Sequence, residues 1–208
     1  MSDQQMSSTI MRNFTSVPAK NSPPLHAMEE SDLLLAVRQG HSAAMTELVE
    51  RNIAAVSRVA KAMLGNTPEA EDVVQETFIR FWSHINSYRH EAKISTFLTR
   101  IAINLAINES RRHQKRQAVE RPLDGMTLNP QRFPQTVQNT PGDDAEHLHM
   151  ALQELDDNQR AVVVLRMLQG YSTKETAQIL DIPLGTVLSR LSRALDKLKI
   201  ILIKYDNV

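Results

Sequence analysis

Cysteine is absent from the 208-residue sequence, which excludes disulfide bonds, thiolate metal sites and a cysteine nucleophile. Aromatic residues make up only 4% of the chain, and leucine, alanine, isoleucine, valine and methionine supply most of the apolar side chains. Because β-sandwiches are rich in aromatic and β-branched residues, this composition favours helices.

Glycine and proline are also scarce, with six and nine residues among the 208. With 41% hydrophobic residues, this scarcity excludes a collagen-like chain and a chain that is disordered throughout. No apolar run approaches the ~18–20 residues of a transmembrane helix, and the N-terminus lacks the charged start and apolar core of a secretory signal. We therefore expect a cytoplasmic protein with no membrane insertion.

The formal net charge is zero, which by itself argues against a nucleic-acid-binding protein. The distribution is uneven, however. Residues 93–121 hold seven basic side chains against two acidic ones, and residues 184–204 hold five against one. Residues 143–160 hold six acidic side chains against one basic. Two basic segments in acidic surroundings indicate local contact with a polyanion, or simply solvated helix faces.

Enzyme signatures are missing from the sequence. It contains no phosphate-binding loop, no dinucleotide-binding glycine motif, no zinc-protease helix and no nucleophile elbow. His147 and His149 are two residues apart, which places them on different faces of a helix and disfavours a metal site. We expect no catalytic residue, no cofactor and no metal, and hence a protein that is not an enzyme.

The apolar periodicity predicts an all-α chain of two small helical domains. Residues 1–28 show no helical period and are predicted to be a disordered tail. Residues 29–117 form the first predicted domain, and residues 118–142, which contain four prolines, form a linker. Residues 143–208 form the second domain. A linker of this length is unusual inside one compact core, which favours two domains.

Local signals mark several helix boundaries. Ser42 and Thr67 are predicted N-caps, and Pro68 suits the first position of the helix that follows Thr67. Gly65 is predicted to end the helix that starts at Ser42. In the second domain, Ser172 and Glu175 have the spacing of a capping box.

The strongest functional signal is a pair of short amphipathic helices, 172–180 and 184–198, joined by the turn Asp181–Pro183. This pattern matches a helix-turn-helix, in which the second helix enters the major groove of DNA. Val187, Leu191, Ala194 and Leu198 share the inner side of that helix, while Ser189 and other polar residues point away. The alternative is an ordinary helical hairpin with a basic surface.

A weaker signal lies in the first domain, where Arg100, Asn104, Asn108 and Arg111 share one helix face and Arg112 follows them. Asparagine can pair with adenine and arginine can bind phosphate. The preceding loop carries Tyr88, Arg89, His90 and Lys93, a set suited to hold an unstacked base. A solvated helix face explains this pattern equally well.

Three separated segments, 70–82, 95–112 and 155–198, resemble the bacterial extracytoplasmic-function (ECF) sigma factors. They read AEDVVQETFIRFW, STFLTRIAINLAINESRR and LDDNQRAVVVLRMLQGYSTKETAQILDIPLGTVLSRLSRALDKL. The resemblance covers roughly 150 residues, in the order of the family and with its linker. It implies a promoter-recognition subunit of RNA polymerase.

The resemblance also implies partners and roles for named residues. In the first domain it implies core polymerase docking for Asp72, Gln75 and Glu76. It implies −10 DNA binding by the loop 87–96 and by the following helix, where the residues are Arg100, Asn104, Asn108, Arg111 and Arg112. The second domain would bind the −35 element of promoter DNA through Lys174, Thr186, Ser189, Arg190, Ser192 and Arg193. The family is typically inhibited by an anti-sigma factor.

The sequence departs from the family pattern at a few positions. Phe97 stands where the family usually has tryptophan, and Asp181 replaces a usual glycine. Leu188 and Leu195 stand where basic residues are common, so the predicted recognition helix is less basic than usual. Two other functions compete with a sigma factor: a stand-alone helix-turn-helix regulator, and a helical adaptor that does not bind DNA.

Overall fold

The computed structural model describes residues 24–88, 93–120 and 143–206, and every regular element in these ranges is helical. The first group of helices comprises η2 (Leu25–Ala27), α2 (Glu30–Arg38), α3 (Ser42–Leu64), α4 (Pro68–His84) and α5 (Ile94–Glu120). The second group comprises α6 (Asp143–Gln153), α7 (Asp157–Val163), the π-helix η4 (Val164–Leu168), α8 (Thr173–Leu180) and α9 (Leu184–Asp206). The all-α prediction is confirmed.

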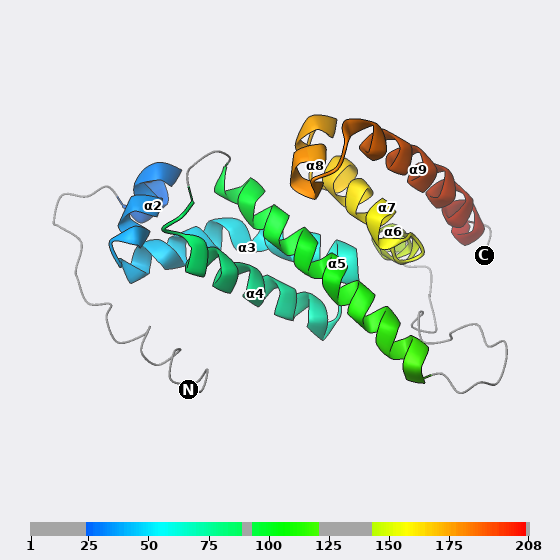
Figure 1. Cartoon of the computed structure of the whole chain (residues 1–208), viewed down its shortest axis with the longest axis horizontal. Helices are drawn as coiled ribbons and strands as arrows, with labels where there is room; N and C mark the ends of the chain where they lie inside the picture. Colours follow the sequence, from blue (N-terminus) through cyan, green and yellow to red (C-terminus); the bar gives the residue numbers. More distant parts are fainter. Residues whose placement is uncertain (1–23, 89–92, 121–142, 207–208) are drawn as a thin grey trace.

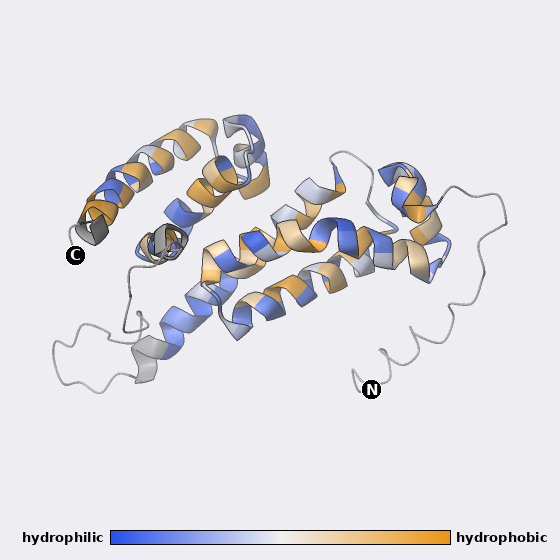
Figure 2. Ribbon diagram, turned by 180° about the vertical axis from the view of Figure 1, so that it is seen from behind, coloured by the Kyte–Doolittle hydropathy of each residue, from blue (hydrophilic) through white to orange (hydrophobic). Residues whose placement is uncertain are grey.

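Helices α3, α4 and α5 lie side by side, and α2 packs at one end of α3 (Figure 1). Their shared core contains Leu34, Leu48, Met63, Phe81 and Leu98, all fully buried. The part of α5 that extends beyond this bundle is hydrophilic (Figure 2). The first domain is thus a three-helix bundle with a short fourth helix, and α5 is its longest member.

Helix boundaries follow the local chemistry that the sequence predicts, with one exception. Thr67 caps α4 by accepting a hydrogen bond from the backbone of Ala70, and Pro68 is the first helical residue. Gly65 ends α3 with a φ of 85°, where a side chain would be strained. The prediction for Ser42 was wrong, because Ser42 is the first residue of α3 and the N-cap is His41, which makes no side-chain capping bond.

The domain boundaries remain predictions, but two of their edges differ from the helices observed. Residues 24–28, within the segment predicted as a disordered tail, form a 3₁₀ turn. The Arg51 guanidinium holds this turn by donating to the carbonyls of Leu25 (2.6 Å) and Met28 (2.9 Å). Helix α5 runs to Glu120, three residues into the predicted linker. Residues 1–23 and 121–142 lie outside the described residues.

Helix α7 joins two hydrophobic cores. Val163 packs with Leu152, Leu155, Ala194 and Leu198 in the core of the second domain. The buried side chains Ala161, Val164, Leu165 and Ile179 instead pack into the apolar cluster of the first domain. The two predicted domains therefore share an apolar contact, which sequence periodicity did not predict.

Arg160 is the polar centre of this junction and is only 3% exposed. Its guanidinium donates to the carbonyls of Leu152 (2.7 Å), Gln153 (2.9 Å) and Leu155 (2.9 Å), where α6 ends. It also donates to the carbonyl of Met63 (2.6 Å) in the last turn of α3. The last carbonyls of a helix lack intrahelical donors and carry partial negative charge, so a cation stabilises both helix ends.

Among the described residues, no helix is both long and apolar enough to cross a membrane.

Replacing Arg160 with methionine is expected to lower the free energy of unfolding by about 3–5 kcal/mol, because four carbonyls in this largely buried junction each lose a hydrogen bond. Urea denaturation of the full chain measures this change. The control Arg58→Met removes an exposed arginine from α3 and should change stability by less than about 0.5 kcal/mol. A loss below about 1 kcal/mol for Arg160→Met would contradict the assigned role.

Candidate nucleic-acid interface

Helices α8 and α9 form the predicted helix-turn-helix. The Ser172 hydroxyl accepts from the Glu175 backbone N–H (3.2 Å), and the Glu175 carboxylate accepts from the Ser172 backbone N–H (2.8 Å), which is a complete capping box. The hydrogen bonds to Ser172 favour the charged form of the Glu175 carboxylate. They are the main reason that the pKa of Glu175 lies below its ordinary value. Helix α8 is thereby anchored at its first turn.

The turn between α8 and α9 depends on Asp181. Its backbone is left-handed, with φ 53° and ψ 50°, a conformation that aspartate tolerates better than most residues. Ile182 and Pro183 complete the turn, and α9 begins at Leu184. The substitution of aspartate for the glycine usual in the family therefore leaves the helix-turn-helix geometry intact.

Helix α9 presents a polar face away from the domain core. Val187 and Ala194 are fully buried, whereas Ser189, Ser192 and Arg193 are exposed. The Arg193 guanidinium folds back onto its own helix and donates to the Ser189 carbonyl (3.1 Å). Because this bond stays within an exposed turn of helix, Arg193 can turn outward to an incoming acceptor at little cost.

The other predicted −35 residues do not all lie on the same side of the helix-turn-helix. Lys174 is exposed beside the turn and lines a shallow groove with Gln178 and Leu184. Thr186 is half-buried, and its carbonyl accepts from the Ser189 hydroxyl (3.1 Å). Arg190 is also half-buried and faces the first domain rather than the surface that carries Arg193. The structure thus leaves Lys174, Ser189, Ser192 and Arg193 exposed, with Thr186 half-buried, and turns Arg190 toward the first domain.

Helix α5 presents the predicted −10 face of the first domain. Arg100, Asn104, Asn108 and Arg111 are exposed, while Leu98, Ala102 and Ala106 on the opposite side are buried. Arg112 is exposed as well and forms an ion pair with Glu109 (2.8 Å), one turn earlier on the helix. The helical spacing read from the sequence places all five predicted residues in solvent.

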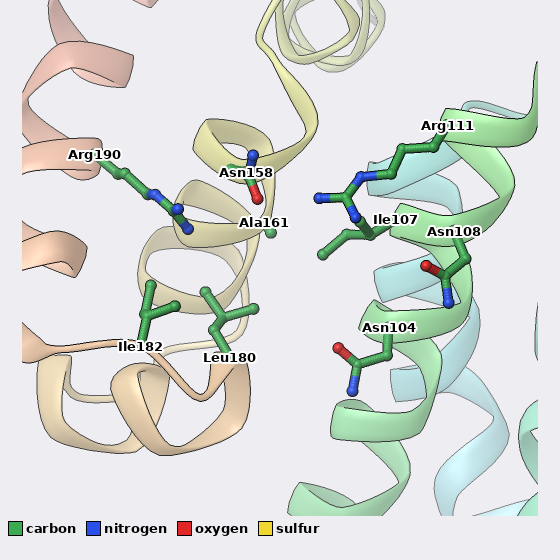
Figure 3. A pocket seen from close by; sticks show the side chains of 9 residues that line it. All are labelled: Asn104, Ile107, Asn108, Arg111, Asn158, Ala161, Leu180, Ile182 and Arg190. Carbon is green, nitrogen blue, oxygen red and sulfur yellow. The ribbon is translucent and has the colours of Figure 1, made fainter. Parts of the chain in front are cut away.

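A cavity of about 440 Å³ separates this face of α5 from the second domain (Figure 3). Asn104, Asn108 and Arg111 line it from α5, and Arg190 points into it from α9. Asn158, at the start of α7, lies between the two guanidiniums, and it was not predicted as a site residue. No local signal marks Asn158, because it reaches the cavity only through the packing of the two domains.

Polar side chains of α4 form a second candidate surface. Asp72 and Gln75 are exposed, and the half-exposed Glu76 pairs with Arg80 at 2.7 Å. Asp72, Glu76 and Arg80 line one wall of a groove of about 430 Å³, whose other wall is Arg112 and Arg116 of α5. The three residues predicted to dock the polymerase therefore share one accessible face, as expected from their spacing.

Tyr88 is not available to stack on a base, contrary to the prediction for the loop that contains it. Its side chain is 8% exposed and packs against Phe97 (ring centroids 5.1 Å apart) and Phe81 (6.2 Å). Burial, with the nearby Glu30 carboxylate as a second cause, raises the pKa of the Tyr88 phenol. Arg89 and His90 lie outside the described residues, and Lys93 is exposed.

Comparison with known proteins agrees with this architecture. Residues 48–116 match the family Sigma-70 region 2, and residues 145–198 match Sigma-70, region 4. The ECF RNA polymerase sigma factor SigW of Bacillus subtilis is 32% identical over 78% of this chain and 91% of its own length. The chain belongs to the ECF family of RNA polymerase sigma factors.

Other relatives extend the comparison. The ECF sigma factor SigM of Mycobacterium tuberculosis strain H37Rv is 29% identical over 81% of this chain and 82% of its own length. The sigma factor RpoE of Bartonella quintana, solved with the anti-sigma factor NepR, superposes with a TM-score of 0.59 at 23% identity. That match covers 76% of this chain and 95% of RpoE, and it shows a shared fold.

The function follows from the family. This chain is an alternative sigma factor for transcription initiation, and sigma factors are initiation factors rather than enzymes. The two competing functions, a stand-alone helix-turn-helix regulator and a DNA-independent adaptor, are therefore set aside. A sigma factor acts on promoter DNA as part of RNA polymerase, so the polar faces of α4, α5 and α9 are candidate contacts with these partners.

The left-handed residue Asp181 allows a direct test of the turn. Asp181→Ala is expected to lower the free energy of unfolding by about 1 kcal/mol, because alanine lacks the local tolerance of aspartate for positive φ. Asp181→Gly, the matched control, should keep or raise stability, because glycine adopts this conformation without strain. Thermal unfolding compares the three proteins; equal stability of the alanine and glycine variants would contradict a left-handed turn.

Proposed function

We propose that the helix-turn-helix reads the −35 element through Ser189, Ser192 and Arg193 of α9, with Lys174 of α8 beside them. The observation that supports this assignment is the polar outward face of α9, which begins directly after the left-handed turn at Asp181. In helix-turn-helix proteins, the first turns of the second helix contact base edges in the major groove. Arg193, as an exposed guanidinium, suits bidentate contact with guanine, while Lys174 suits a phosphate. Thr186 and Arg190 complete the proposed set from the flanks of the helix.

For the −10 element we propose the α5 face, with Asn104 and Asn108 on bases and Arg100, Arg111 and Arg112 on phosphates. All five side chains are exposed along one long helix, which supports contact with a strand of DNA. Phosphate contacts of this kind release counterions, so binding should weaken as salt rises. The proposed face is one wall of the cavity in Figure 3.

We further propose that Asp72, Gln75 and Glu76 dock this sigma factor on core RNA polymerase. Their exposure on one side of α4 leaves carboxylate and amide oxygens open to a basic or amide-rich partner surface. The domain ranges 29–117 and 143–208, joined by 118–142, are part of this proposal, with docking and −10 binding in the first range. The catalytic chemistry belongs to the polymerase, and we propose that the chain acts in the cytoplasm together with it.

An anti-sigma factor is a further proposed partner. Two solved structures with the same fold are complexes of this kind: RpoE with NepR, and CnrH with the cytosolic domain of CnrY. CnrH superposes with a TM-score of 0.59 at 22% identity over 84% of this chain and 97% of CnrH. NepR and CnrY are partners of those proteins, and an inhibitor of this chain is proposed by analogy with them.

Arg193→Ala tests the −35 assignment. If Arg193 contacts guanine with both of its donors, the variant should lose about 1–3 kcal/mol of binding and discriminate less at one −35 position. The measurement is transcription by the reconstituted holoenzyme on promoters changed one −35 base at a time. Arg58→Ala on α3 is the control. Equal activity of Arg193→Ala and the unaltered protein on every promoter would remove Arg193 from the interface.

The double variant Asp72→Lys/Glu76→Lys tests docking. Reversing two exposed charges should weaken binding to core polymerase at least about tenfold, or ~1.4 kcal/mol. The fold should survive, since the Glu76–Arg80 pair is exposed and contributes little. Glu29→Lys/Glu50→Lys changes net charge equally at exposed positions outside the proposed face and is the control. Binding to core is measured by fluorescence anisotropy; unchanged affinity of the Asp72/Glu76 variant would exclude this face.

A further inference from the structure

The cavity between the two domains carries positive charge that no described side chain neutralises. Arg111 of α5 and Arg190 of α9 both line it, and none of the described residues that line it is an aspartate or a glutamate. Neither guanidinium forms a hydrogen bond or an ion pair with another described residue. By contrast, Arg112 on α5 and Arg193 on α9 each bond an oxygen of their own helix. The two guanidiniums in the cavity are therefore available to an anion.

Both guanidiniums lie at the same end of the cavity, on either side of Asn158 (Figure 3). Like charges in one confined space repel each other, and an anion with two or more negative charges removes this repulsion. A guanidinium presents a fork of N–H donors that matches phosphate oxygens, and the Asn158 amide adds a donor between the two forks. This end of the cavity has the chemistry of a polyphosphate site.

The opposite end of the cavity is apolar on one wall and polar on the other. Leu180 and Ile182 reach into it from the second domain, and Asn104 of α5 faces them (Figure 3). Aliphatic side chains give the flat face of a base an apolar contact. An asparagine amide donates and accepts at once, which is how it pairs with the edge of adenine. A purine base therefore suits this end.

The cavity exists because the two domains pack against each other, a closed arrangement in which each domain contributes one wall (Figure 3). Sites for small molecules are commonly found between domains and enclose ~300–1,000 Å³. At about 440 Å³ the cavity lies within this range. A DNA duplex, whose major groove alone is ~12 Å wide, is far larger. The size of the cavity thus indicates a small ligand rather than promoter DNA.

We propose that this cavity binds a nucleoside di- or triphosphate, with adenine as the preferred base. Arg111, Asn158 and Arg190 hold the phosphates, and Asn104 pairs with the base while Leu180 contacts its face. The site needs neither polymerase nor DNA, so it goes beyond the proposed function. Asn104 and Arg111 also belong to the proposed −10 face, and a bound nucleotide therefore competes with a −10 strand. This consequence alone rests on the proposed function.

Isothermal titration calorimetry of the full chain measures nucleotide binding directly. At ~150 mM salt, which screens exposed charges, ATP should bind one site per chain with a dissociation constant of about 100 µM or lower. Inorganic pyrophosphate, which lacks the base, should bind at least about tenfold more weakly. Equal affinities for ATP and pyrophosphate would overturn the assignment to a nucleotide. No saturation with either compound up to about 5 mM would overturn the site.

Other nucleotides test the preference for adenine. GTP and CTP carry the same phosphates as ATP but present different edges to the Asn104 amide, so each should bind about threefold or more weakly than ATP. Equal affinities for the three nucleotides would contradict the pairing of Asn104 with the base.

Single alanine variants test the phosphate end. Arg111→Ala and Arg190→Ala each remove a charged donor and should weaken ATP binding at least about tenfold. Asn158→Ala removes a neutral donor that lies outside the proposed DNA faces, and it should weaken binding about threefold or more. Circular dichroism and thermal unfolding should match the unaltered protein, because both guanidiniums lack a described partner.

Two lysines provide matched controls. Lys115→Ala on α5 and Lys199→Ala on α9 each remove one positive charge from an exposed position of the same helices, outside the cavity. Both variants should bind ATP within about twofold of the unaltered protein. A loss as large as that of the arginine variants would show that ATP is attracted by charge alone, and would overturn the site.

Competition with DNA separates the site from the proposed function. A fluorescent single-stranded −10 oligonucleotide should bind the free chain, and ATP should displace it at concentrations near its own dissociation constant, as measured by anisotropy. An oligonucleotide that stays bound in saturating ATP would overturn the competition. If ATP binds and the oligonucleotide does not, the proposed −10 face fails, whereas the nucleotide site is supported by its own binding measurement.

Discussion

The Arg160 guanidinium lies where α3, α6 and α7 meet, and it donates to backbone carbonyls of both domains. Burying this cation costs solvation energy, which its bonds to the carbonyl ends of two helices offset. Asp157 lies 3.7 Å away, so a carboxylate adds to the compensation. The closed arrangement of the molecule depends on this site, because removing the cation leaves unpaired carbonyls at the end of each domain.

Helix α5 carries three functions on three sides. One side packs into the first domain through Leu98 and Ala102, and another presents the proposed −10 contacts. The third contacts α7 through Ser110, next to Asn108 and Arg111. Since the proposed DNA contacts and the contact with the second domain occupy neighbouring positions on one helix, occupation of either surface should affect the other. The length of α5, from Ile94 to Glu120, makes room for all three.

Local features were predicted well where local chemistry decides them. The capping box at Ser172, the cap at Thr67 and the turn at Asp181 each depend on residues within a few positions of one another. The exposure of Asn104, Ser189 and Arg193 follows from the 3.6-residue period of a helix, which sequence spacing shows directly. Ser42 was misassigned because the cap position shifted by one residue to His41, which offers no side-chain cap.

The sequence by itself determined the helices, their caps and the family to which the chain belongs. Only the tertiary structure decided that Tyr88 is buried against Phe97, that Arg190 faces α5, and that α7 contributes to two cores. Periodicity shows which side of a helix is apolar, but not which partner covers that side. Ala161 and Val163 are both buried positions of one short helix, yet Ala161 packs into the distant first domain while Val163 packs within the second, and only the tertiary structure separates the two.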